Sequence, residues 1–148
     1  MKRLLVCLDS SNRASQVLAA AVELVQAFGG SLLLLRAIGL DHPLSQNEPL
    51  SPDELRDRLI DQERGDLIQR AAVIPEKALE EIVVMIGTPW SAICETAREK
   101  QVDLIVIGSH GYSGLDRLLG TTAAKVIHHA DRSVFVFRPT EDDSSTAR

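Results

Sequence analysis

Residues 104–122 read LIVIGSHGYSGLDRLLGTT, an apolar run, a glycine-rich segment and the start of a helical pattern. Residues 104–107 form an apolar run with the length and composition of a strand buried on both faces. Glycines then gather between Gly108 and Gly120, and glycine lets an anion approach the backbone amides closely. A helical pattern follows over residues 121–130, and a helix N-terminus offers unpaired amides to an anion. The stretch therefore predicts a phosphate-binding turn between a strand and a helix, with a plain tight turn as the alternative.

The same alternation of short apolar runs and helical patterns extends over the chain. Four further strands are expected, at residues 4–8, 31–38, 81–86 and 134–137. Helices are expected at residues 14–28, 51–72, 88–100 and 121–130. Parallel neighbours need long crossover connections, and these are right-handed. The pattern predicts an α/β fold: a five-stranded parallel open sheet with helices on both faces.

The carboxyl ends of the strands are the expected place for a ligand. In open parallel sheets ligands bind beyond these ends, where the strand order reverses direction. Asp9, Ala37, Gly87 and Gly108 all lie at such ends. For Asp9 a second role stays open, because an aspartate just before a helical pattern commonly caps the helix.

Local signals predict where the helices begin. Either Ser10 or Ser11 is available to cap the first helix. Residues 51–54, Ser-Pro-Asp-Glu, combine a cap, a proline at the first helical position and a glutamate that completes a capping box. Thr88 is expected to cap the third helix, and Gly65 could break the second.

Composition and charge favour one small intracellular domain. The chain has 148 residues, of which 45% are apolar, so we expect a single domain over residues 1–139 and a disordered acidic, polar tail over 140–148. The net charge of -5 argues against nucleic-acid binding. Because no run approaches the ~18 apolar residues of a membrane span and no signal-peptide pattern is present, we expect no membrane insertion and a cytoplasmic location. Cys7 and Cys94 are expected to be buried structural thiols.

The glycine segment resembles the nucleotide motif of the universal stress protein family, written G-x2-G-x9-G-[S/T]. Residues 108–111, Gly-Ser-His-Gly, match its first half, and Gly120-Thr121 matches its second half. Residues 4–9, LLVCLD, are similar to the family's first strand, which ends in aspartate, and residues 86–89, IGTP, to the end of its third strand. The resemblance covers most of the chain. It implies the Rossmann-like fold of the adenine nucleotide alpha hydrolase-like type.

In members that bind ATP, the resemblance implies contacts from seven positions. Glycine amides and threonines of the motif would hold phosphate, the end of the fourth strand would contact the nucleoside, and the tips of the first two strands would line the cleft and meet the adenine edge. The implied phosphate contacts are Gly111, Gly120, Thr121 and Thr122, and the implied nucleoside contact is Gly108. Asp9 is implied to line the cleft, and Ala37 to meet the adenine edge.

Eight residues separate Gly111 from Gly120, one fewer than in the family pattern, and this leaves more than one function open. The first hypothesis is a regulatory module of the stress response whose cleft binds ATP or AMP, with Mg²⁺ as an optional companion, and which an unknown protein partner reads. The second is a dimeric interaction protein of the same fold that binds no nucleotide. An ATPase would at most be slow, because the chain has no Walker A lysine, no acidic pair for magnesium and no placed base.

Resemblance to the family also implies a homodimer through the last strand, residues 134–137, Val-Phe-Val-Phe. An uncovered apolar edge strand is an aggregation hazard, which favours the same arrangement. Trp90 is expected to pack over the sheet end rather than stack on a base. Several polar residues near the motif are expected to be loop, surface or interface groups without a metal: His110, Arg117, Lys125, His128 and His129.

Overall fold

The computed structural model of the chain describes residues 2–39, 49–109 and 119–140. Its five strands are β1 (Arg3–Cys7), β2 (Ser31–Ile38), β3 (Leu79–Ile86), β4 (Leu104–Gly108) and β5 (Ser133–Phe137). All five expected strands are confirmed. Their ends differ from the expected ones by two residues at most, the largest shift being at β3, which begins at Leu79 instead of Glu81.

The five strands form one parallel sheet in the order β3-β2-β1-β4-β5. The chain builds from β1 outward to β3, then crosses to the other side of β1 and adds β4 and β5. The strand order therefore reverses between β1 and β4, where Cys7 is the register partner of Ile107. This reversal at the carboxyl ends is where open α/β sheets bind ligands.

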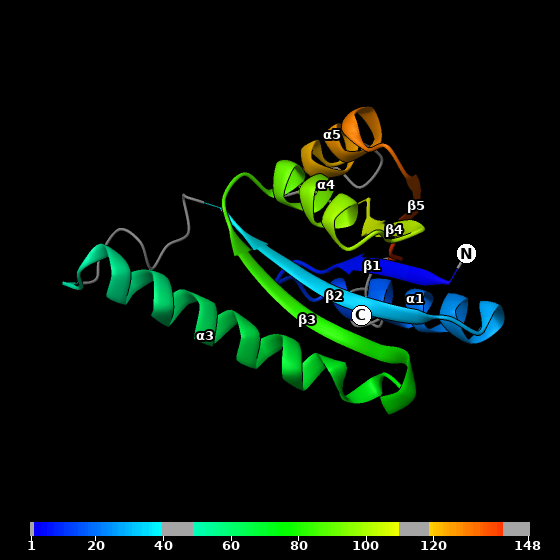
Figure 1. Ribbon diagram of the computed structural model, residues 1–148, viewed down its shortest axis with the longest axis horizontal. Coiled ribbons are helices and arrows are strands. Elements are labelled where there is room, and N and C mark those ends of the chain that lie inside the picture. Colours follow the sequence, from blue (N-terminus) through cyan, green and yellow to red (C-terminus); the bar gives the residue numbers. More distant parts are fainter. Residues whose placement is uncertain (1, 40–48, 110–118, 141–148) are drawn as a thin grey trace, which may run out of the picture.

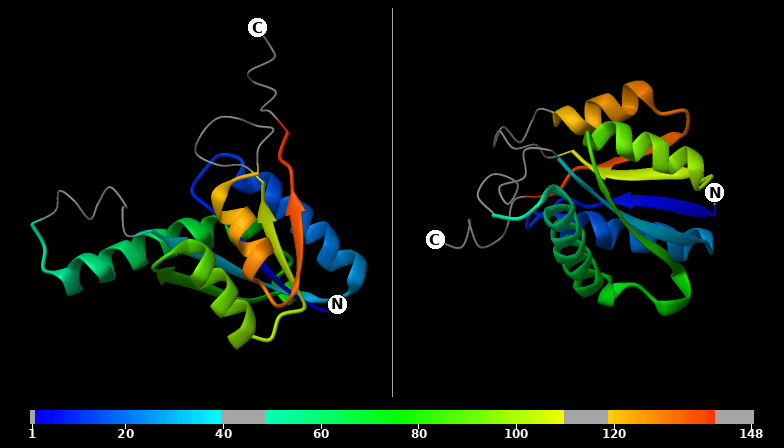
Figure 2. Two further views of the ribbon diagram at one scale, coloured as in Figure 1. Left: turned by 90° about the horizontal axis from the view of Figure 1, so that it is seen from above. Right: turned by 60° about the vertical axis from the view of Figure 1, so that its left-hand side comes forward.

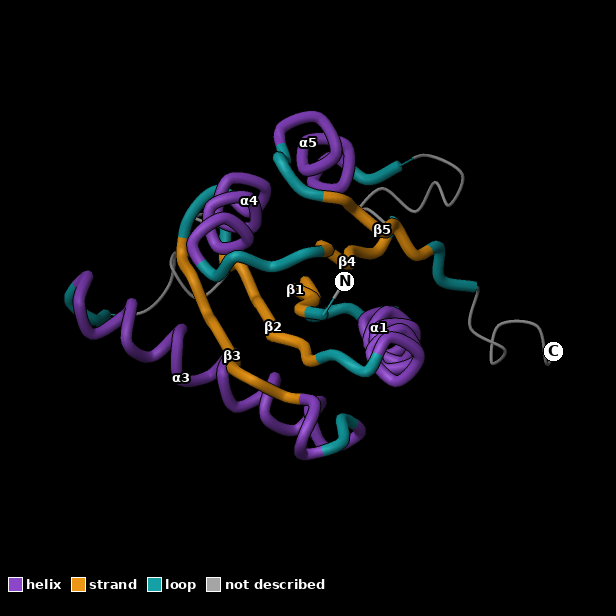
Figure 3. The backbone as a smooth tube through the Cα atoms, turned by 45° about the vertical axis from the view of Figure 1, so that its right-hand side comes forward, coloured by secondary structure: helices purple, strands orange, loops and turns teal. Residues whose placement is uncertain are grey.

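The described helices cover both faces of the sheet. They are α1 (Ala14–Phe28), α3 (Pro52–Arg70), α4 (Pro89–Glu99) and α5 (Thr121–His129). The pair α1 and α3 lies on one face, and the pair α4 and α5 lies on the other (Figures 1 and 3). Figure 2 shows α5 next to β4 and β5. Two short 3₁₀ turns, Ala71–Val73 and Glu76–Ala78, lead from α3 to β3.

Each face of the sheet has its own apolar core. Alternate residues of β1 point to opposite faces, so Leu4 and Val6 join the core under α1 and α3, while Leu5 and Cys7 join the core under α4 and α5. Burial on both faces explains why the strands read as continuous apolar runs rather than as alternating patterns.

The second expected helix begins as its sequence predicts. The Ser51 hydroxyl accepts a hydrogen bond of 3.2 Å from the Glu54 amide, with Pro52 in the first turn. The helix then runs unbroken through Gly65 to Arg70, so the break considered at Gly65 is absent. Leu59 and Leu67 bury their side chains on either side of Gly65, which offsets the roughly 1 kcal/mol cost of a helical glycine.

The expected cap of α1 is wrong, and that of α4 is right in position but lacks a side-chain bond. Helix α1 starts after Arg13, without a side-chain cap, so Ser10 and Ser11 both lie before the cap position. The Ser11 amide and hydroxyl donate instead to Asp9 Oδ1, at 2.9 and 2.6 Å. Asp9 also lies before the cap position and does not cap α1. At α4, Thr88 occupies the cap position but its side chain makes no capping bond. Only its carbonyl takes part, as the acceptor of the Ala92 amide at 3.0 Å.

Several further expectations concern the ends and the thiols. Cys7 and Cys94 are free and buried, as expected.

Thr140, the first residue of the expected tail, exchanges hydrogen bonds with Gln16 on α1, at 2.9 and 3.1 Å. Residues 141–148 of that tail lie outside the described residues, as do His110, Gly111 and Arg117. In the described ranges no helix has both the length and the apolar character needed to span a membrane.

Candidate functional site

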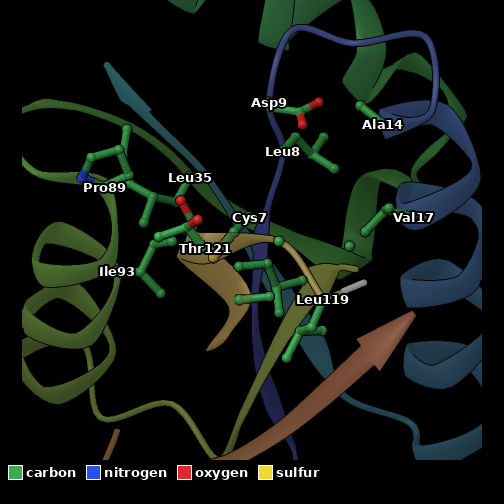
Figure 4. A pocket seen from close by; sticks show the side chains of 16 residues that line it. Cys7, Leu8, Asp9, Ala14, Val17, Leu35, Pro89, Ile93, Leu119 and Thr121 are labelled. Atoms are coloured by element: carbon green, nitrogen blue, oxygen red, sulfur yellow. The ribbon is translucent and has the colours of Figure 1, made fainter. Parts of the chain in front are cut away.

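A cavity of about 450 Å³ opens at the carboxyl ends of the central strands, where the strand order reverses. Its floor is formed by the ends of β1 and β4, through Cys7 and Ile107, together with Leu35 of β2. Figure 4 shows Ala14 and Val17 of α1 on one side and Pro89 and Ile93 of α4 on the other, with Thr121 between them. The cavity is therefore enclosed by the ends of strands and by the first turns of three helices.

The structure brings six of the seven sequence-predicted site residues into the wall of this cavity. Each stands at the end of a strand or the start of a helix, which is why residues more than 100 positions apart in sequence meet here. The six are Asp9, Ala37, Gly108, Gly120, Thr121 and Thr122. The seventh, Gly111, lies outside the described residues.

The two described ends of the glycine segment are joined by backbone hydrogen bonds. The Gly120 amide donates to the Ser109 carbonyl at 2.9 Å, and the Ser109 amide donates to the Phe137 carbonyl at 2.8 Å. Ser109 is buried, so this junction is part of the interior of the fold. The Gly120 amide is therefore already engaged and is not an unpaired donor at the cavity wall.

Helix α5 turns its amino end toward the cavity. The first amide that closes a hydrogen bond within this helix is that of Ala124, which donates to the Gly120 carbonyl at 3.0 Å. The preceding amides, of Thr121, Thr122 and Ala123, belong to the first turn, where a helix has no internal acceptor for them. All three residues line the cavity. Their amides, the threonine hydroxyls and the positive end of the helix dipole suit an anion.

Helices α1 and α4 add their own amino ends to the same cavity, through Ala14 and Pro89. Each helix N-terminus carries a partial positive charge of about half an elementary charge. Among the described lining residues, Asp9 is the only one with a charged side chain. An anion bound in the cavity would thus lie near the positive ends of α1, α4 and α5 and near the first amides of α5.

Asp9 is held by the turn that follows β1. Its Oδ1 atom accepts hydrogen bonds from the amide and the hydroxyl of Ser11. A carboxylate that is already an acceptor in a turn is oriented by that turn, and Figure 4 shows it at the mouth of the cavity. It can therefore offer an oxygen to a ligand hydroxyl without first being ordered.

The apolar part of the cavity wall was missed by the sequence analysis. It includes Val17, Leu35, Pro89, Ile93 and Leu119. These residues appear in the sequence as ordinary members of helical or strand patterns, and only their closeness to a strand end or a helix start could have indicated them. They give the cavity an apolar surface of the kind that a flat aromatic ring needs.

Cys7 lies at the floor of the cavity as an uncharged group. Burial, assisted by the proximity of Cys94, raises the pKa of its thiol well above the usual range. A thiol that stays protonated is a poor nucleophile.

Trp90 and the histidines of α5 form a separate surface cluster. The Trp90 ring stacks on His129, with centroids 4.4 Å apart, and Lys125 Nζ lies 6.0 Å from the Trp90 ring centre. His128 meets His129 edge to face at 4.8 Å. None of these four residues lines the cavity, and Trp90 is partly buried against the core under α4 and α5. In the described part of the chain no group of three or more His, Cys, Asp or Glu could hold a metal ion.

Comparison with known proteins gives a consistent result over nearly the whole chain. The family model described as the universal stress protein family matches residues 1–138. A universal stress protein of Thermus aquaticus is 30% identical over 139 residues, which cover 93% of this chain and 98% of that protein.

Solved structures give the same picture of the fold. A universal stress protein from Lactobacillus plantarum superposes with a TM-score of 0.73 at 26% identity, covering 93% of this chain and 97% of the other. Two more distant structures are a universal stress protein in complex with cAMP (22% identity, TM-score 0.66, 94% and 98% covered) and one from Archaeoglobus fulgidus in complex with dAMP (21%, 0.56, 92% and 97%). At this level of identity, the two structures show that the chain shares their fold.

Proposed function

The chain belongs to the universal stress protein family, and from this premise we propose that it is a regulatory module of the stress response that binds an adenine nucleotide. The nucleotide would occupy the cavity at the carboxyl ends of β1 and β4. Its presence would set the shape of the surface around the cavity, which a protein partner reads.

One observation carries this proposal. Six residues that the sequence singled out at strand ends and at a helix start line a single cavity of about 450 Å³. That volume lies within the range of pockets that hold small organic ligands. A set of residues chosen only for turn formation would not need to converge on one cavity.

The chemistry of the wall fits the two ends of a nucleotide. Phosphate oxygens suit the amides and hydroxyls of Thr121 and Thr122 at the start of α5. An adenine ring suits the apolar wall, and the Ala37 backbone near the end of β2 can offer polar groups to its edge. Asp9, on the same wall, would be the acceptor for a ribose hydroxyl. Each part of the ligand would thus meet a matching part of the wall.

ATP and AMP are the two nucleotides that we propose, with Mg²⁺ as an optional companion of ATP. The cAMP and dAMP complexes of two proteins with this fold support an adenine monophosphate. Hydrolysis would be slow at most, because the described lining contains Asp9 as its one charged side chain and that carboxylate already accepts two hydrogen bonds from Ser11.

Isothermal titration with AMP, ATP, ATP with Mg²⁺ and GMP tests the proposal. Saturable binding of AMP or ATP with a 1:1 stoichiometry, together with at least tenfold weaker binding of GMP, is expected. The guanine amino and carbonyl groups differ from those of adenine at the ring edge, so a wall that reads this edge discriminates against them. Absence of heat and of any thermal shift at millimolar adenine nucleotide would contradict it.

The second candidate, a dimeric interaction protein, draws on the edge position of β5. Among the described strands β5 pairs with β4 alone, and Phe135 on it is 38% exposed. We propose that a second copy of the chain covers residues 133–137. Light scattering at micromolar concentration is expected to give the mass of a dimer, and Phe135→Lys to shift it to that of a monomer. A monomeric mass for the unaltered protein would reject the dimer without affecting nucleotide binding.

We further propose that the protein acts in the cytoplasm, where adenine nucleotides are abundant and thiols such as Cys7 and Cys94 stay reduced. Cell fractionation with an antibody to the native protein tests this location. Recovery mainly in the membrane or secreted fraction would contradict it.

A further inference from the structure

A buried arginine lies directly behind the cavity. Arg36 stands on β2 between Leu35 and Ala37, both of which line the cavity. Because neighbouring strand residues point to opposite faces, the Arg36 side chain leaves on the face covered by α1 and α3. Only 3% of this residue is exposed. A guanidinium buried to this extent needs partners, and the partners indicate its role.

Two partners of Arg36 are backbone carbonyls at the cavity wall. Nε donates to the Leu8 carbonyl at 2.7 Å, and Nη2 donates to the Asp9 carbonyl at 3.0 Å. Leu8 and Asp9 both line the cavity. A planar guanidinium holds two acceptors in a fixed relative position, which the single charged point of a lysine cannot do. Arg36 thereby fixes the chain where it leaves β1.

Acidic residues of α3 hold the guanidinium from the other side. Arg36 Nη1 lies 2.5 Å from Glu63 Oε2 and 2.9 Å from Asp66 Oδ2. Glu63 is itself buried. The orientation of Arg36, and with it the position of the two carbonyls, is therefore set by α3.

A second arginine extends this arrangement. Arg70 Nε donates to Asp66 Oδ2 at 3.0 Å, and Arg70 Nη2 donates to the Ser11 carbonyl at 3.4 Å. Asp66 thus bridges the two arginines. We call Arg36, Glu63, Asp66 and Arg70 the arginine clamp. The two arginines of the clamp, Arg36 on β2 and Arg70 on α3, together bind three of the four carbonyls in residues 8–11.

Stability alone gives little reason for such an arrangement. Replacing a buried ion pair by apolar side chains of similar volume is often neutral or stabilising. Apolar side chains could not, however, donate to the carbonyls of Leu8 and Asp9. These residues belong to neither strand nor helix, since β1 ends at Cys7 and α1 begins at Ala14. Within the segment, the Leu8 amide donates to the Leu35 carbonyl at 3.0 Å and Ser11 donates to Asp9 Oδ1. The carbonyls of Leu8 and Asp9 are held by the Arg36 guanidinium.

We propose that Arg36 is a positioning residue that holds residues 8–11 as a fixed wall of the cavity, and that tight nucleotide binding requires the arginine clamp. The second part rests on the proposed nucleotide function. The first part concerns the protein without ligand and can be tested separately.

The test compares two matched arginine variants. Arg36→Met combined with Glu63→Gln removes the clamp while avoiding an unpaired buried carboxylate. Arg64→Met is the control, because Arg64 Nη1 donates to the Ile82 carbonyl of β3 at 2.9 Å and neither residue lines the cavity. The clamp variant is expected to raise the Kd for AMP about tenfold or more, since misplacing a binding group by about an ångström has effects of this size or larger. The control is expected to stay within about twofold of the unaltered protein.

Hydrogen exchange without nucleotide supplies a second readout. The Ser11 amide donates to Asp9 Oδ1, so its exchange rate reports on the turn that the clamp holds. In the clamp variant this amide is expected to exchange at least about tenfold faster, while amides in the centre of β1 keep their rates. Arg64→Met is expected to leave the Ser11 amide unchanged. If the double variant does not fold, Arg70→Met, at a less buried position, takes its place with a smaller effect in the same direction.

The outcomes separate the two claims. Faster exchange at Ser11 together with weaker AMP binding supports both parts. Unchanged exchange overturns the positioning role, and faster exchange with unchanged AMP affinity overturns the requirement of the clamp for binding. If the unaltered protein binds neither AMP nor ATP, the proposed function fails, whereas the exchange rates still decide whether Arg36 positions the wall.

Discussion

The backbone amide of Gly120 donates a hydrogen bond of 2.9 Å to the carbonyl of Ser109. This bond joins the end of β4 to the start of α5, and the Ser109 amide is fixed in turn on the Phe137 carbonyl of β5. Both described ends of the segment between β4 and α5 are therefore held by backbone hydrogen bonds. The segment that is one residue shorter than the family pattern lies between these two points, and Thr121 and Thr122 line the cavity.

Removing the two threonine hydroxyls of α5 tests whether they hold phosphate. The double variant Thr121→Ala with Thr122→Ala is expected to weaken AMP binding by about tenfold to hundredfold, because a hydrogen bond to a charged group contributes about 1.5–3 kcal/mol. Titration calorimetry with AMP measures the effect. Adenosine, which has no phosphate, is the control ligand and should bind the variant and the unaltered protein alike. Equal losses for both ligands would show that the hydroxyls do not contact phosphate.

Two glycines with different surroundings are expected to respond in opposite directions to alanine. A Cβ at Gly30 would lie 2.2 Å from the Lys2 carbonyl oxygen, which already accepts the Ser31 amide between β1 and β2. Gly30→Ala is expected to lower the free energy of unfolding by about 1–3 kcal/mol or more, the usual cost of forced overpacking. Urea denaturation measures the change.

Gly65→Ala provides the matched control. A Cβ at Gly65 meets nothing within 4 Å, and the residue lies inside α3. Alanine there is expected to raise the free energy of unfolding by about 0.5–1 kcal/mol, because it reduces the entropy lost on forming the helix. Loss of stability in Gly65→Ala, or none in Gly30→Ala, would be inconsistent with the packing described for these positions.

Acid is expected to weaken the arginine clamp through Asp66. Desolvation acts to raise the pKa of this carboxyl, but the hydrogen bonds and charges of Arg70 and Arg36 outweigh it, so the pKa of Asp66 lies below its usual value of 3.8. A lowered pKa in the folded state contributes stability that is present above the unfolded value and is lost as the pH falls through the folded value.

Asp66→Asn isolates this contribution from those of other carboxyls. The difference in the free energy of unfolding between the unaltered protein and Asp66→Asn is expected to be constant above about pH 5 and to shrink below about pH 4. Urea denaturation at several pH values between 3 and 7 measures it. A difference that stays constant down to pH 3 would show that Asp66 is not charged in the clamp.

Strand placement could be predicted from sequence because both faces of this sheet are buried. Continuous apolar runs such as residues 31–38 then have definite ends, set by polar or glycine residues. Capping was harder to predict. Several side chains near a helix start are candidates for the cap, and at α1 the helix begins only after Arg13, beyond both serines and Asp9. Competition of this kind depends on distances that a sequence does not contain.

The polar part of the cavity could also be predicted, since glycines and threonines at a strand-to-helix junction have a specific pattern. Its apolar part and the arginine clamp could not. Val17 and Ile93 look like any other core residue of a helix, and Arg36 looks like an interruption of an apolar strand. The partners of Arg36 come from the segment that follows β1 and from α3, at positions separated from it by 27 or more residues. Only the folded arrangement brings them together.

A crystal structure obtained with excess AMP or ATP is the most direct test of the central claim. We expect a nucleotide in the cavity at the carboxyl ends of β1 and β4. Its phosphate oxygens should lie at hydrogen-bond distance from the amides of Thr121 and Thr122, and its adenine ring should lie against Val17 and Ile93. A cavity that stays empty at saturating nucleotide, or a nucleotide bound at another surface, would contradict the account.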